Sequence, residues 1–175
     1  MKKTISILLL IVLSLLIFNS VMAQNKKIQI GDKVPFFTLK DQFNNDFSIE
    51  QYVGNKNIVI YFYPKDDTPG CTKEACKFRD EYETFTDLDA LVIGISSDDV
   101  ASHLNFSKKY NLPFTLLADT KKEVRKLFGV PNSMVLIPGR VTYIINKKGI
   151  VISIFDSLSK AEQHVETAKE MLKQK

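Results

Sequence analysis

The chain has 175 residues, of which 45% are hydrophobic and 25% charged, an ordinary composition for one globular domain. Seven glycines and six prolines are too few for a fibrous or low-complexity protein. A net charge of +4, with no arginine-rich face, excludes nucleic acid as an expected partner.

The N-terminus has the parts of a secretory signal peptide. Met1-Lys2-Lys3 precedes an apolar run over residues 5–18, and Val21-Met22-Ala23 provides a cleavage site. The run is shorter than the roughly twenty residues that span a bilayer. We therefore expect a signal peptide at 1–23, one domain at 24–175, and an exported, periplasmic protein that does not contact the membrane once cleaved. Retention of the segment as an anchor is the alternative.

The first half of the chain predicts three strands and one long helix. The expected strands are Pro35–Leu39, Asp46–Ile49 and Ile58–Tyr63, and the expected helix is Thr72–Phe85. The third strand is an unbroken run of β-branched and aromatic residues, the pattern of a strand buried on both faces. Residues 64–70, between this strand and the helix, predict a loop.

The second half alternates strands and helices and ends in a hairpin and a helix. The expected strands are Leu91–Ile95, Phe114–Leu117, Val141–Ile145 and Ile150–Phe155, and the expected helices are Val100–Tyr110, Lys122–Phe128 and one opened by a capping box, Ser159-Lys160-Ala161-Glu162. Ser96-Ser97-Asp98-Asp99 provides capping side chains for the helix at 100–110. This order predicts an α/β domain with a central mixed sheet flanked by helices on both faces.

The two cysteines of the chain, Cys71 and Cys76, lie five residues apart where the third strand gives way to the helix. The unpaired N–H groups and the positive dipole end of a helix N-terminus favour a thiolate at Cys71. A thiolate is the reactive form of cysteine, so this stretch predicts sulfur redox chemistry.

Two structural explanations of the cysteine pair are less favoured. In a continuous helix the two Cα atoms lie about 8.6 Å apart, beyond the ~7 Å that a disulfide tolerates without backbone movement. A zinc site would need about four cysteine or histidine ligands, and His103 and His164 are far away in sequence. A transient disulfide that unwinds the first helical turn stays open.

The third explanation is a reactive thiolate with a resolving partner. The turn Thr68-Pro69-Gly70 can expose the sulfur of Cys71, and the Thr68 hydroxyl can donate to the thiolate or to a bound oxygen. A thiolate held among donors can attack a peroxide O–O bond and become a sulfenic acid. Cys76 is the second thiol in the chain that could condense with it.

The segment Tyr63-Pro64-Lys65-Asp66-Asp67-Thr68-Pro69-Gly70-Cys71-Thr72 closely resembles the active-site loop P-x-x-x-T-x-x-C of peroxiredoxins. The C-x4-C spacing is similar to the Q type, also called bacterioferritin comigratory proteins. Residues 92–98, 112–119 and 139–146 also resemble strands of that family, so the resemblance covers about residues 28–172.

The resemblance implies a thioredoxin-like fold, no cofactor and no metal. It implies that Cys71 is the peroxidatic cysteine and Cys76 the resolving one, that Thr68 and Arg140 position the peroxide, and that Pro64 shields the pocket. The expected substrates are hydrogen peroxide and organic hydroperoxides, and the expected reductant is thioredoxin or a thioredoxin-like dithiol. Because Q-type relatives are often monomeric, a monomer is expected.

Two other functions fit a reactive thiol. An exported thiol–disulfide oxidoreductase is disfavoured because such enzymes generally carry C-x-x-C, and a redox-sensing binding module would stop after one oxidation. One feature departs from many Q-type members: residues 130–138 before Arg140 are more apolar. His103 is interpreted as a helix-surface residue and not as a proton shuttle.

Overall fold

The computed structural model describes residues 27–133 and 137–174, so the predicted signal peptide at 1–23 lies outside the described residues. The strands are β1 (Thr38–Asp41), β2 (Asp46–Ser48), β3 (Asn57–Phe62), β4 (Ala90–Ser96), β5 (Thr115–Ala118), β6 (Asn132–Ser133), β7 (Ile137–Pro138), β8 (Val141–Ile145) and β9 (Val151–Asp156). The helices are α2 (Pro69–Asp80), α3 (Tyr82–Asp87), α4 (Val100–Tyr110), α5 (Glu123–Leu127) and α6 (Ala161–Lys173), with a 3-10 turn, η1, at Ile49–Gln51.

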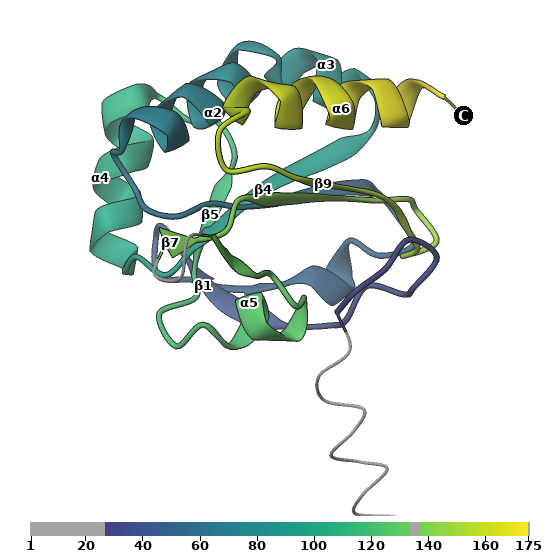
Figure 1. Cartoon of the computed structure of the whole chain (residues 1–175), viewed down its shortest axis with the longest axis horizontal. Coiled ribbons are helices and arrows are strands. Elements are labelled where there is room, and N and C mark those ends of the chain that lie inside the picture. The colour runs from purple at the N-terminus through teal and green to yellow at the C-terminus, as the bar shows by residue number, and fades with distance from the viewer. Residues whose placement is uncertain (1–26, 134–136, 175) are drawn as a thin grey trace, which may run out of the picture.

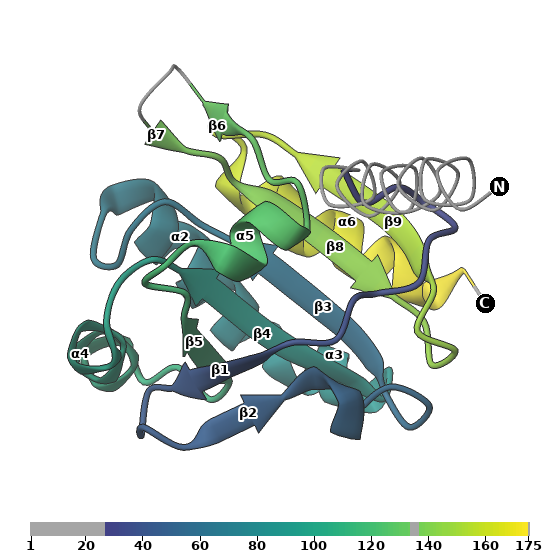
Figure 2. The same cartoon turned by 90° about the horizontal axis from the view of Figure 1, so that it is seen from below.

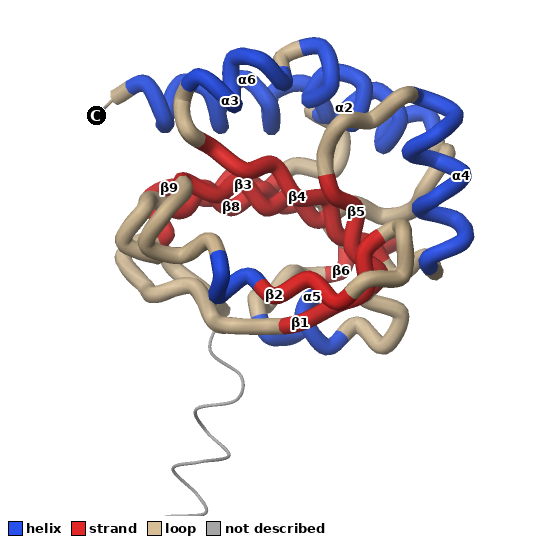
Figure 3. The backbone as a smooth tube through the Cα atoms, turned by 180° about the vertical axis from the view of Figure 1, so that it is seen from behind, coloured by secondary structure: helices blue, strands red, loops and turns tan. Residues whose placement is uncertain are grey.

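Seven strands form one sheet in the order β2-β1-β5-β4-β3-β8-β9. β4 pairs parallel with β3 and β5, whereas β8 pairs antiparallel with β3 and β9. Helices α2, α3 and α6 cover one face and α5 lies on the other (Figures 1 and 3). The predicted mixed sheet with helices on both faces is confirmed.

Strand β3 is buried along its whole length because it separates two apolar cores. Ile58, Ile60 and Phe62 belong to the core beneath α5, while Val59 and Tyr61 belong to the core beneath α2 and α6. Successive side chains of a strand point to opposite faces, so an unbroken apolar run requires cover on both sides. The end of β3 is therefore a fixed point from which the following loop starts.

The long helix predicted at 72–85 is divided and begins earlier than expected. It starts at Pro69, because a proline at the first helical position loses no hydrogen bond there. Glu81, with φ −101° and ψ 8°, interrupts it between α2 and α3. The loop is thus shorter than predicted, and Cys71 lies inside the first turn of α2 rather than before the helix.

Other boundaries differ by small amounts. The Asp99 cap of α4 is confirmed, since its side chain accepts from Ser102 N at 2.8 Å. The capping box at 159–162 is wrong: α6 begins after Lys160, which makes no side-chain cap. Strands β6 and β7 interrupt the apolar segment 130–138, of which residues 134–136 lie outside the described part. Within that part, no helix combines the length and apolar character needed to cross a bilayer.

Candidate active site around Cys71

The Cys71 thiol is held at the N-terminus of α2 and faces the sheet. Its side chain is 2% exposed and packs in the core with Tyr61, Tyr63 and Ala75. The first-turn backbone amides of a helix lack intrahelical acceptors and favour negative charge nearby. The sulfur is therefore held at a helix N-terminus and shielded from bulk water.

Arg140 reaches Cys71 because β8 pairs with β3. The last pair of this ladder is Phe62 with Val141, so Arg140 lies beside the loop that leaves β3. Its Nη2 donates to Cys71 Sγ at 3.4 Å, and its Nε donates to the Leu158 carbonyl at 3.1 Å. A Cβ on Gly70 would lie 3.1 Å from Arg140 Nη2. Glycine at this position thus leaves room for the guanidinium against the sulfur.

Glu74 is the counter-charge of Arg140, and sequence reasoning missed it. Its carboxylate is fully buried and accepts a hydrogen bond from Arg140 Nη1. Burial raises the pKa of the Glu74 carboxyl, whereas the Arg140 guanidinium opposes this rise and favours the ionised form. The signal that could have found it is its spacing of three residues from Cys71, which puts both on one helical face. One guanidinium is thus shared between a carboxylate and a thiol.

His164 on α6 lies next to Glu74 and belongs to the same buried polar cluster. Its Nε2 lies 2.8 Å from the Ser157 carbonyl, which can only accept, so Nε2 carries a proton. Burial lowers the pKa of His164 to about 4, so the ring is neutral at pH 7 and Nδ1 accepts from the Thr142 hydroxyl at 2.8 Å. Nδ1 also lies 3.7 Å from Glu74 Oε1, which lacks a hydrogen-bond partner among the described residues.

We predict that His164 makes the fold sensitive to acid. Since the pKa of His164 falls to about 4 on folding, the unfolded chain takes up this proton first, and stability present above pH 6.5 is lost as pH falls towards 4. The full shift corresponds to about 3 kcal/mol. Urea unfolding of wild type and His164→Gln at pH 7 and pH 4.5 measures it. The variant should lose less stability than wild type between these values, and equal losses would contradict the prediction.

Thr68 and Pro64 lie in the segment that leads from β3 to Cys71. Thr68 directly precedes α2, and its hydroxyl donates to the Lys65 carbonyl at 3.1 Å. Pro64 is half-buried at the start of the loop. Because a hydroxyl has one proton, Thr68 has to rotate before it can donate to a bound oxygen.

Cys76 lies on the same continuous helix and is half-buried, and both thiols are free. The geometry expected from the sequence is therefore present: the Cα atoms of two residues five apart in an α-helix are about 8.6 Å from each other, beyond the ~7 Å that a disulfide spans. A bond between the two sulfurs requires α2 to unwind locally.

The loop between β3 and α2 is anchored by His103, which is fully buried. The interpretation of His103 as a helix-surface residue is wrong. Its Nδ1 lies 2.9 Å from Asp66 Oδ2 and its Nε2 lies 3.1 Å from the Leu117 carbonyl. The Tyr63 hydroxyl donates to Asp66 Oδ1 at 2.7 Å. Asp66 therefore links the loop to α4, and through His103 to β5, and its buried carboxyl has an imidazole and a hydroxyl as partners.

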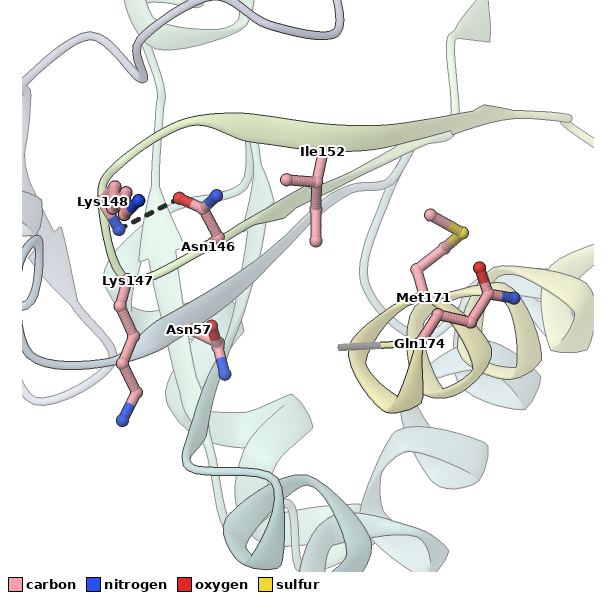
Figure 4. Close-up of a pocket in the computed structure, with 7 residues that line it drawn as sticks. All are labelled: Asn57, Asn146, Lys147, Lys148, Ile152, Met171 and Gln174. Carbon is pink, nitrogen blue, oxygen red and sulfur yellow. Dashed lines mark hydrogen bonds between the residues drawn. The ribbon is translucent and has the colours of Figure 1, made fainter.

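Two hollows differ in their relation to the thiol. One, of about 450 Å³, is lined by Asn57, Asn146, Lys147, Lys148, Ile152, Met171 and Gln174 (Figure 4). Asn57 opens β3, so this hollow lies at the opposite end of that strand from Cys71. A second groove, of about 390 Å³, borders Gly70 and Lys73 on α2 and the first turn of α6. This second groove adjoins the residue before the thiol.

Metal chemistry has no candidate ligand set in the described ranges. There, no three histidine, cysteine, aspartate or glutamate side chains come close enough together to hold an ion. Cys71, Arg140 and Glu74 are the groups that the structure brings into contact at this position.

The chain is similar to known proteins over most of its length. Residues 30–154 match the AhpC/TSA family. A chloroplastic peroxiredoxin Q of Populus jackii is 48% identical over 83% of this chain and 68% of its own. Among solved structures, a Mycobacterium tuberculosis peroxidoxin aligns with a TM-score of 0.78 at 32% identity, over 83% of this chain and 97% of its own. A Xanthomonas campestris bacterioferritin comigratory protein, described for alkyl peroxide reduction, aligns at 0.73 and 29% identity, over 78% and 90%.

The comparison also corrects the expected location. The poplar, wheat and Arabidopsis relatives are all named as chloroplastic proteins. They point to a plastid, so the expectation of an exported, periplasmic protein is wrong.

Proposed function

Since the chain belongs to the AhpC/TSA family and is a peroxidase of the Q-type peroxiredoxins, we propose that Cys71 is its peroxidatic cysteine and Cys76 its resolving cysteine. The supporting observation is the contact of Arg140 Nη2 with Cys71 Sγ, at 3.4 Å, in the first turn of α2. The contact joins residues 69 positions apart in sequence, and its chemistry suits a thiolate.

In the first step the Cys71 thiolate attacks one oxygen of a hydroperoxide. The S–O bond forms as the O–O bond breaks, sulfur is oxidised to a sulfenic acid, and the departing oxygen leaves as hydroxide or alkoxide and takes a proton from solvent. Arg140 donates to the oxygens as negative charge develops, which is where a fixed donor lowers the barrier. Thr68, after rotating from the Lys65 carbonyl, is the second donor, and Pro64 limits water at the mouth of the site.

In the second step the sulfenic acid condenses with the Cys76 thiol to a disulfide, and water leaves. This step needs the first turns of α2 to unwind, because the intact helix separates the two sulfurs. Unwinding is eased by two features of the N-terminus: Gly70 disfavours helix by about 1 kcal/mol relative to alanine, and the Thr68 side chain does not cap the helix.

In the third step an external dithiol reduces the disulfide. Its two thiols become a disulfide while Cys71 and Cys76 regain their protons, so the cycle consumes one dithiol per hydroperoxide. We propose thioredoxin or a thioredoxin-like protein as this dithiol. Peroxide-dependent NADPH oxidation in the presence of thioredoxin and its reductase tests the cycle. Exchange of a peptide disulfide without peroxide consumption would favour a thiol–disulfide oxidoreductase instead.

A mass measurement tests the role of Cys76. One equivalent of hydrogen peroxide should remove two hydrogens from the wild-type chain and leave no free thiol. Cys76→Ser should instead gain one oxygen and complete one turnover, because its sulfenic acid has no partner within the chain. A wild-type protein that keeps a free Cys76 thiol beside a sulfenic acid would contradict the prediction.

A further inference from the structure

Arg125 is a second buried arginine, and the steps above do not use it. It lies on α5, which covers the sheet face opposite α2 (Figure 2). Its side chain is 4% exposed. A guanidinium loses much hydration on burial, and its hydrogen bonds have to compensate for that loss. The acceptors of these hydrogen bonds therefore indicate the role of the side chain.

The Arg125 guanidinium forks between two backbone carbonyls at the site. Its Nη2 donates to the Tyr63 carbonyl at 2.9 Å, and its Nη1 donates to the Gly139 carbonyl at 2.9 Å. Tyr63 directly precedes Pro64 and the loop to Cys71, and Gly139 directly precedes Arg140. One planar group therefore contacts both segments that carry the reacting residues.

This fork lies where the sheet stops joining those segments. The β3–β8 ladder ends at the pair Phe62 and Val141, so Tyr63 and Gly139 are beyond its last register pair. No β3–β8 register pair sets the separation of Tyr63 and Gly139. A guanidinium presents its N–H groups in a fixed plane, so it sets that separation where the ladder does not.

Arg125 is itself held in place from several sides. Its backbone N–H donates to Asp119 Oδ2 at 2.7 Å, and its carbonyl accepts from Val130 N at 3.0 Å. Its guanidinium lies 5.6 Å from the centre of the Phe62 ring. A donor supported in this way can impose a position on its acceptors.

We propose that Arg125 is a positioning residue that sets the location of Arg140 relative to the Cys71 loop. The proposal rests on the proposed roles of Cys71 and Arg140. Arg125 acts from the far face of the sheet, through the two carbonyls, and does not contact the peroxide. Its loss should impair the attack on a peroxide, which needs Arg140 aligned on the oxygens, more than a reaction that needs only the thiolate.

The test compares two reactions of Cys71 in the full chain. Oxidation by hydrogen peroxide is measured by competition with a haem peroxidase, and alkylation by iodoacetamide is measured by mass. Arg125→Lys keeps the charge and loses the fork, and Arg125→Met loses both. Because a shift of 1 Å can slow a positioned reaction ~100-fold, we expect oxidation to slow about 10-fold in Arg125→Lys and about 100-fold in Arg125→Met. Alkylation of Arg125→Lys should stay within about 2-fold of wild type.

Lys126→Met, which removes the exposed neighbouring cation, is the matched control and should match wild type in both reactions. Oxidation at the wild-type rate in Arg125→Lys and in folded Arg125→Met would overturn the proposal. Equal slowing of oxidation and alkylation in Arg125→Lys would also overturn the proposal. This second outcome can be measured even if Arg125→Met does not fold. If Cys71→Ser still reduced peroxide catalytically, the proposed function itself would be wrong. If Cys71→Ser is inactive and the Arg125 variants are normal, the positioning role alone fails.

Discussion

Cys71→Ser should abolish peroxide reduction while leaving the fold intact. The substitution exchanges one small buried side chain for another, but a serine hydroxyl is not ionised beside Arg140 and cannot form a sulfenic acid. We expect the turnover rate to fall by about four orders of magnitude or more, as when the nucleophile of a covalent enzyme is removed. Loss of hydrogen peroxide with excess thioredoxin system measures the effect.

Cys76→Ser is the matched control for this experiment, because it removes the other thiol of the same helix. It should still consume one equivalent of peroxide, whereas Cys71→Ser should consume none. Thermal unfolding of both variants checks that the fold is kept. If Cys71→Ser consumed peroxide catalytically, the reaction would not pass through this sulfur, and the proposed function would have to be abandoned.

Arg140→Met should have the second largest effect, because it removes the donor that faces Cys71 Sγ. Loss of one fixed donor to developing negative charge typically costs ~10²–10³ in rate. We expect the rate constant for Cys71 oxidation by hydrogen peroxide to fall by about that factor. The same change leaves Glu74 buried without its counter-charge, so stability should fall by about 3–5 kcal/mol.

The double variant Arg140→Met/Glu74→Gln separates these two effects. Removing the carboxylate as well takes away the uncompensated buried charge, so much of the lost stability should return. The oxidation rate should stay low, since the donor is still absent. Urea unfolding and the peroxide competition assay measure the two quantities on the same proteins. If oxidation recovered with stability, Arg140 would serve only the fold.

The elements that could be predicted well were those set by local pattern. Strands β4 and β8 and helix α4 match their predicted ranges to within one residue, because continuous apolar runs and a capping aspartate mark them. The boundaries of α2 and α6 were less well predicted. No capping side chain marks the break at Glu81 or the start at Lys160, so local sequence pattern did not locate these boundaries.

The sequence by itself determined that a thiol lies at the start of a helix with a second thiol five residues on, since helical spacing is a local property. Resemblance to a family, and no local pattern, indicated Arg140. Only the tertiary structure decided that Arg140 meets Cys71, that Glu74 is its counter-charge, and that Arg125 and His103 hold the surrounding backbone. These contacts join residues 14 to 69 positions apart. Strand pairing and helix packing bring such residues together, so their chemistry depends on the sheet order and not on any short stretch of chain.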